Sequence, residues 1–246
     1  MKIILTIAKR ETVLLFDSLI AYVLLVVFLG FSGFFTWVYG SDVFYTGQAS
    51  LKSFFTASYW ILFLFVPALT MRTLAEERKT GTLELLLTKP VTDWQVVAGK
   101  YLSVLALVGT ALLLTLPYYF TVWVLGDVDH GATIMGYMGL LLMSSALAGL
   151  GIFASSLTDN QIIAFIASLL AGIFFVLIFD VISQQMYGAT GVIVNYLSMT
   201  GHYDSISRGV IDTRDVIYFL TVTFLGLFLA SATLSKRNIV DEEVKK

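Results

Sequence analysis

Residues 162–182 read IIAFIASLLAGIFFVLIFDVI and are almost entirely apolar. The stretch holds one charged residue, Asp180, near its C-terminal end. A helix of about 20 apolar residues is long enough to cross the hydrocarbon core of a bilayer. The stretch is therefore predicted to be a membrane-spanning helix.

Five more segments have a similar length and a similar apolar character. They are Leu19–Tyr39, Phe54–Leu74, Tyr101–Leu125, Gly136–Ser156 and Val216–Leu234. The 246 residues are 58% hydrophobic and only 13% charged, whereas a soluble domain carries about 25% charged residues. We therefore expect an all-α integral membrane protein with six transmembrane helices, folded as a single domain over residues 1–246.

The basic residues predict the orientation. Twelve of the fifteen lysines and arginines precede the first span, lie from the last residues of the second span to the start of the third, or follow the sixth. The other three are Lys52, Arg208 and Arg214. Because lysine and arginine concentrate on the cytoplasmic side of membrane proteins, both termini are expected in the cytoplasm.

The N-terminal segment, residues 1–17, is predicted to be an amphipathic interfacial helix on the lipid bilayer. Its polar face gathers Lys2, Thr6, Lys9, Arg10 and Asp17, and its apolar face gathers Ile4, Ile7, Ala8, Leu14 and Leu15. Glu11 falls on the apolar face. Its carboxylate either reaches up to the lipid headgroups or contacts the cytoplasmic loop or a partner protein.

The long loop after the second span holds most of the functional information. Residues 72–91 read RTLAEERKTGTLELLLTKPV. Arg72 and Glu76 are four residues apart, which favours a helix that continues out of the span, and Gly81 is expected to end that helix. The following short helix, residues 83–88, is too short to cross a membrane and too apolar to stand alone in water, so it requires a partner.

The sequence lacks the residues that several classes of function require. The chain has no cysteine, two histidines without partners at metal-ligand spacing, and a net charge of −2 that gives no case for nucleic acid. No G-x-x-x-x-G-K-[ST] phosphate-binding loop occurs, so ATP would have to bind to another polypeptide. No charge lies near the middle of a span, which argues against a proton-coupled carrier. No histidine or lysine lies in a span to activate a nucleophile, which argues against a membrane-embedded enzyme.

Two motifs resemble those of a known family. Residues 76–91, EERKTGTLELLLTKPV, followed by Gly99 and Lys100, are similar to the signature of ABC-2-type transporter permeases. The second cytoplasmic turn, residues 155–161, reads SSLTDNQ and is also similar to theirs. The narrower likeness is to the GldF-like permeases of gliding-motility systems.

The resemblance implies a permease subunit, of an exporter, in the bacterial inner membrane. It implies a second permease subunit, identical or related, and a separate cytoplasmic ABC ATPase that binds ATP and Mg²⁺. This chain would then hold no cofactor, no metal and no catalytic residue. Residues 75–92 would form the coupling loop, and the ATPase interface would comprise Glu76, Glu77, Gly81, Thr82, Leu83, Glu84, Leu86, Pro90, Asp159 and Asn160.

The opposite side carries the long segment 183–214. Its apolar run, residues 192–197, fits a short re-entrant or interfacial helix, and the resemblance implies a cap over the exit. Asp180, His202, Asp204 and Arg208 are candidates for a substrate or exit region, although a solvated loop explains them equally well.

Two questions stay open from the sequence. Small residues in the fourth span (Ser144, Ser145, Ala148, Gly149) and the sixth (Gly226, Ala230) predict close helix contacts, within the chain or at a dimer face. The chain could also be a non-transporting anchor or scaffold subunit of a larger gliding or secretion complex, because such a subunit needs the same docking loop.

Overall fold

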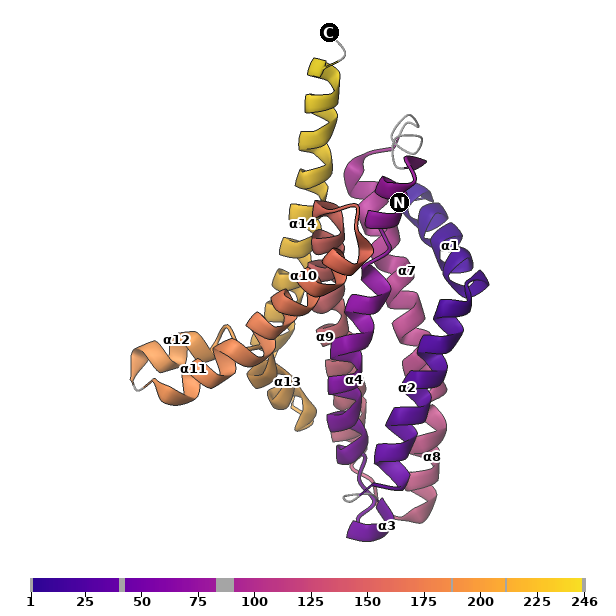
Figure 1. Cartoon of the computed structure of the whole chain (residues 1–246). Coiled ribbons are helices and arrows are strands. Elements are labelled where there is room, and N and C mark those ends of the chain that lie inside the picture. The colour runs from indigo at the N-terminus through magenta and orange to yellow at the C-terminus, as the bar shows by residue number, and fades with distance from the viewer. Residues whose placement is uncertain (1, 40–42, 83–90, 187, 211, 245–246) are drawn as a thin grey trace.

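The structure is a computed structural model that describes residues 2–39, 43–82, 91–186, 188–210 and 212–244 (Figure 1). Every element in these ranges is a helix. Six segments are long and apolar enough to cross a membrane: Leu19–Trp37, Lys52–Lys79, Asp93–Leu125, His130–Leu157, Gln161–Gln185 and Thr213–Lys236. They coincide with the six predicted spans, so the prediction of an all-α, multi-pass membrane protein is confirmed.

Most of the helices stand side by side in one bundle, and one pair reaches away from it (Figure 1). In chain order they are α1 (Lys2–Asp17), α2 (Leu19–Trp37), α3 (Val43–Thr46), α4 (Lys52–Thr70), α5 (Ala75–Lys79), α7 (Asp93–Leu114), α8 (Leu116–Leu125), α9 (His130–Leu157), α10 (Gln161–Ile173), the π-helix η1 (Phe174–Ile178), α11 (Phe179–Gln185), α12 (Ala189–Asn195), α13 (Met199–Ser207) and α14 (Thr213–Val244). Helix α5 and the C-terminal end of α14 lie at one end of the bundle, and α3 and α8 lie at the other (Figure 1). We call the first the terminal end; it is the predicted cytoplasmic side.

Two spans are interrupted for identifiable reasons. The third changes from α7 to α8 at Thr115, two residues before Pro117, which has no N–H to donate within a helix. The fifth passes through the π-helix η1, an element that nothing in the sequence predicted. The Thr200 hydroxyl of α13 donates to the Val176 carbonyl at 2.8 Å, so α13 is tied to the π-helical turn.

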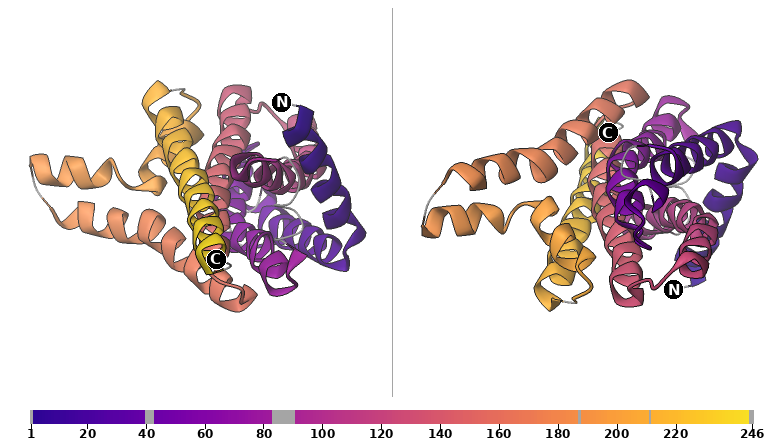
Figure 2. Two further views of the ribbon diagram at one scale, coloured as in Figure 1. Left: turned by 90° about the horizontal axis from the view of Figure 1, so that it is seen from above. Right: turned by 90° about the horizontal axis from the view of Figure 1, so that it is seen from below.

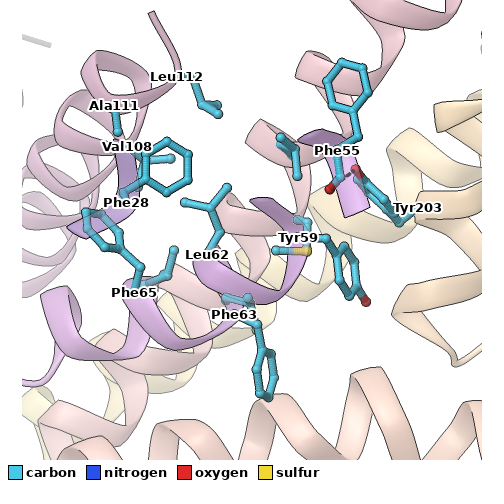
Figure 3. Close-up of a cluster of buried hydrophobic side chains, with 14 of the residues drawn as sticks. Phe28, Phe55, Tyr59, Leu62, Phe63, Phe65, Val108, Ala111, Leu112 and Tyr203 are labelled. Carbon is cyan, nitrogen blue, oxygen red and sulfur yellow. Dashed lines mark hydrogen bonds between the residues drawn. The ribbon is translucent and has the colours of Figure 1, made fainter. Parts of the chain in front are cut away.

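The interior between α2, α4, α7 and α9 is filled by side chains (Figure 3). Phe28, Leu62 and Val108 have no exposed surface, and Phe28 packs against Phe65 with ring centroids 5.9 Å apart. Helices in a bilayer associate through such close packing, because lipid tails are as apolar as the side chains. The described bundle is therefore a solid core.

The small residues of α9 and α14 mark a close crossing within the chain. A Cβ atom at Gly149 would lie 2.8 Å from the Thr223 carbonyl oxygen, and one at Gly226 would collide with the Gly149 backbone. The Ser145 and Thr223 hydroxyls are 2.9 Å apart and hydrogen-bonded. The predicted helix contact is confirmed; the alternative of a dimer face is wrong for Ser145 and Gly149, because they are buried against α14.

A pair of helices stands away from the bundle. Figure 2 shows α11 and α12 side by side, reaching outward beyond α13. Helix α12 lies in the segment where a short helix was expected. Val181, Val192 and Ile193 are between 52% and 64% exposed on these two helices, so the pair presents apolar surface to its surroundings.

Candidate functional site

The terminal end of the bundle brings the two sequence motifs together. The Ser155 hydroxyl of α9 accepts hydrogen bonds from the backbone N–H groups of Leu74 and Ala75, at 3.1 and 3.0 Å, and donates to the Met71 carbonyl at 3.1 Å. The first N–H groups of a helix have no partner inside it, so Ser155 supplies the cap for α5. Ser155, the first residue of the motif at residues 155–161, thereby holds the first turn of α5, where the motif at residues 76–91 begins.

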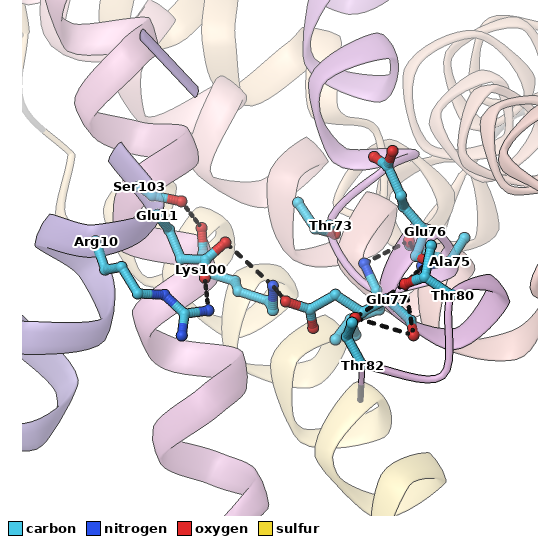
Figure 4. A network of polar contacts seen from close by, with 12 residues as sticks. Arg10, Glu11, Thr73, Ala75, Glu76, Glu77, Thr80, Thr82, Lys100 and Ser103 are labelled. Atoms are coloured by element: carbon cyan, nitrogen blue, oxygen red, sulfur yellow. Dashed lines mark hydrogen bonds and ion pairs between the residues drawn. The ribbon is translucent and has the colours of Figure 1, made fainter. Parts of the chain in front are cut away.

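A second connection runs through Lys100 of α7 (Figure 4). Its Nζ lies 2.7 Å from Glu77 Oε1 and 3.2 Å from Glu11 Oε2, and only 2% of the side chain is exposed. Arg10 also pairs with Glu11, at 2.7 Å. A buried ammonium is tolerated only with such partners, since desolvation costs several kcal/mol. Lys100 therefore joins α1, α7 and α5.

Gly99 explains how α1 comes close enough for this contact. A Cβ atom there would lie 2.6 Å from Ile7 Cγ2 and 3.3 Å from the Ile4 carbonyl oxygen. Only glycine allows α1 to pack directly on the α7 backbone. The Gly99–Lys100 pair thus provides a close helix contact and, one residue later, an ion pair.

The apolar side chains of α1 divide between contact with α7 and exposure. Ile4 and Ile7 pack toward α7, while Leu5 and Leu14 are 58% and 54% exposed. Glu11 contacts Lys100 of α7, and it is linked to the loop helix α5 only through the second pair of that lysine, with Glu77. Burial alone would raise the pKa of Glu11, but Lys100 and Arg10 outweigh it and lower that pKa below its ordinary value.

The predicted loop residues have distinct surroundings. Glu76 pairs with Arg72 at 2.9 Å, as their spacing predicted. Gly81 has φ +70°, a conformation that favours glycine, and follows the end of α5. The Thr82 and Thr80 hydroxyls are 2.9 Å apart. The remaining four predicted loop residues lie outside the described residues: Leu83, Glu84, Leu86 and Pro90.

The turn between α9 and α10 lies beside α5. Asn160 caps α10, because its Oδ1 accepts from the Ile162 N–H at 2.9 Å. Asp159 is exposed. These two predicted interface residues therefore share the terminal end with Glu76, Glu77, Gly81 and Thr82.

At the other end the four predicted exit residues divide into two environments. His202 is buried; its Nδ1 lies 2.6 Å from Asp215 Oδ1 and its Nε2 lies 3.0 Å from the Tyr196 carbonyl oxygen. Asp204 is exposed, and the Arg208 guanidinium donates to its backbone carbonyl at 3.2 Å.

Asp180 lies close enough to Asp204 for their charges to interact. Partial burial and the Asp180 carboxylate raise the pKa of Asp204, and Arg208 and Lys52 offset part of that rise. His202 thus belongs to a buried pair with α14, whereas Asp180, Asp204 and Arg208 form a more exposed polar group.

Sequence reasoning missed three residues of these sites: Ser155 as a cap, Asp215 as the partner of His202, and Lys100 as the bridge. Only Lys100 had a signal, because an acidic residue on an otherwise apolar helix face, Glu11, requires a cationic partner. Within the described ranges no three histidines, aspartates or glutamates are grouped as a metal site would require.

Comparison with known proteins identifies the family of the chain. The family model described as "ABC-2 family transporter protein" matches residues 34–234. The chain is 33% identical over 101 residues to the "Probable multidrug ABC transporter permease YbhR" of Escherichia coli strain K12, and to its counterpart in strain O157:H7. Each alignment covers 41% of this chain and 27% of the relative, so the chain matches about a quarter of the relatives' length. Because the family model covers most of the chain, the protein belongs to the ABC-2 family of transporter proteins, as a membrane-spanning permease.

Proposed function

We propose that this chain is the permease subunit of an ATP-driven ABC exporter, and that residues 75–92 dock a separate ATPase. The observation that carries the proposal is the double attachment of α5. Glu77 ties it to α7 through Lys100, and Ser155 ties its first turn to α9. A push on the loop is therefore passed directly to two membrane-spanning helices. ATP and Mg²⁺ would bind in the partner.

The passage is proposed to lie between two permease subunits. The described bundle is filled, whereas an apolar groove of about 980 Å³ lies on its surface. The groove is lined mainly by α2 and α4, with Phe165 of α10. A second permease subunit would close it. The apolar lining and the printed name of the relatives, a multidrug permease, support a hydrophobic compound as the substrate.

The role of residues 75–92 in docking the ATPase is tested by replacing Gly81 with proline, which cannot adopt the backbone conformation of Gly81. Gly81 has φ +70° and donates its N–H to the Arg78 carbonyl; proline fixes φ near −65° and has no N–H. Gly47, at the opposite end, is a matched control with φ +63° and an N–H that donates to the Val43 carbonyl. The tagged chain is purified in mild detergent from its native host, and the eluate is assayed for ATP hydrolysis.

Wild type and Gly47→Pro should bring down an ATP-hydrolysing subunit, and Gly81→Pro should insert in the membrane without it. If Gly81→Pro retains the ATPase fully, residues 75–92 are not the docking loop. If no ATPase accompanies wild type, the anchor or scaffold function replaces the transporter.

A further inference from the structure

We propose that Lys100 is a positioning residue that makes α1 and the loop helix α5 one unit, so that α1 takes part in coupling. This inference rests on the proposed function for its consequence, but the attachment itself can be tested without any ATPase. Lys100 is on α7, and its two carboxylate partners come from elements 89 and 23 residues away along the chain.

The attachment depends on Lys100 rather than on Arg10. Arg10 can hold Glu11, but its side chain is 50% exposed and it is not paired with Glu77. The second carboxylate oxygen of Glu77 is buried and has no hydrogen-bond partner among the described residues. Without Lys100, two carboxylates would face each other with no cation between them, and like charges at close range repel.

Close packing adds a mechanical constraint to this electrostatic one. Gly99 lets α1 rest directly on α7, so α1 cannot slide independently at this point. One residue further, Lys100 holds the loop helix to the same place. A displacement of α5 toward the membrane would therefore move α1 and α7 together.

The chain has no cysteine, so two introduced cysteines can be spin-labelled specifically. Lys9→Cys on α1 and Lys79→Cys at the end of α5 place labels at exposed positions. Pulsed electron–electron double resonance on the protein in nanodiscs then measures the distance between the two labels. Wild type, Lys100→Arg and the control Lys52→Met, an exposed lysine at the opposite end, should each give one narrow distribution.

Lys100→Met should give a broader and longer distribution, because both carboxylates lose their shared cation. Glu77→Gln provides a milder second variant that leaves the Lys100–Glu11 pair in place, and it should broaden the distribution in the same direction. Unchanged distributions in both variants would overturn the proposal.

The functional consequence is measured on the purified complex. Lys100→Met should retain the bound ATPase while its hydrolysis rate falls to that of the isolated ATPase, and Lys100→Arg should restore the wild-type rate. A wild-type rate in Lys100→Met would remove Lys100 from coupling. Absence of an ATPase from the wild-type complex would instead refute the proposed function, and the distance measurement would still decide the attachment.

Discussion

At the residue scale, polar side chains withdrawn from solvent hold the helices of this chain together. The pair of His202 on α13 and Asp215 on α14 is one example, with 8% and 7% of the side chains exposed. His202 is also stacked on Tyr218, with ring centroids 4.1 Å apart. Breaking such a pair leaves the remaining group without a partner in a low-dielectric environment, and this costs more than the pair itself contributes.

His202→Ala is therefore expected to destabilise the protein by about 3–5 kcal/mol, because Asp215 would remain buried and unpaired. The other histidine, His130, is exposed and bonded to the Tyr119 hydroxyl at 2.8 Å. His130→Ala is the matched control and should change stability by at most about 0.5 kcal/mol. Thermal unfolding in detergent compares the two. Equal melting temperatures would contradict a structural role for His202.

The depressed pKa of Glu11 predicts a pH dependence at the terminal end. A carboxyl whose pKa is lower in the folded state stabilises the fold above its ordinary pKa, 4.5, and loses that contribution as the pH falls through the folded value. The groups that face it are Arg10, Lys100 and, across Lys100, Glu77.

We expect the label distance between positions 9 and 79 to stay constant from neutral pH down to about 4.5 and to lengthen below it. Glu11→Gln should remove the part of this transition that belongs to Glu11. A transition of the same size in Glu11→Gln would assign the pH dependence to another carboxyl.

At the element scale, the close crossing of α9 and α14 allows the helix packing to be tested directly. Gly149→Ala would place a methyl group against the Thr223 backbone, and overpacking of this kind costs about 1–3 kcal/mol. Gly109 lies within α7 with no atom near its Cβ position, so Gly109→Ala should stabilise its helix by up to about 1 kcal/mol. Opposite shifts in melting temperature are expected. A stabilised Gly149→Ala would show that the two helices are not in contact.

The elements themselves could be predicted from the sequence, because a span is a local property of about 20 residues. The small residues of α9 and α14 likewise revealed a close contact. The π-helix η1 could not be predicted, because its stabilising partner, Thr200, lies 24 residues away. The candidate site was predictable only in part for the same reason: the motif identified the loop, but Ser155 and Lys100 contact it from other helices.

At the scale of the whole molecule, the described bundle has two kinds of exposed apolar surface. Much of it lies outside the groove, as at Leu113 on α7, and lipid tails can cover it. The groove between α2 and α4 is concave and includes Phe31, Trp60 and Leu64, each between 45% and 55% exposed. The filled core of one bundle leaves no room for a passage. A second subunit placed over the concave groove would enclose one.

A two-fold symmetric interface brings residues near its axis close to their own copies. Because the chain has no cysteine, single substitutions at Phe31, Trp60 and Leu64 report this directly. In native membranes, at least one of these cysteine variants should form a disulfide-linked dimer on mild oxidation, whereas Leu113→Cys, 64% exposed but outside the groove, should remain monomeric. If Leu113→Cys cross-links and the groove positions do not, the subunits meet on α7 and the groove faces lipid. If none cross-links although each thiol reacts with maleimide, two identical grooves do not face each other, and a related but different subunit would have to close the passage.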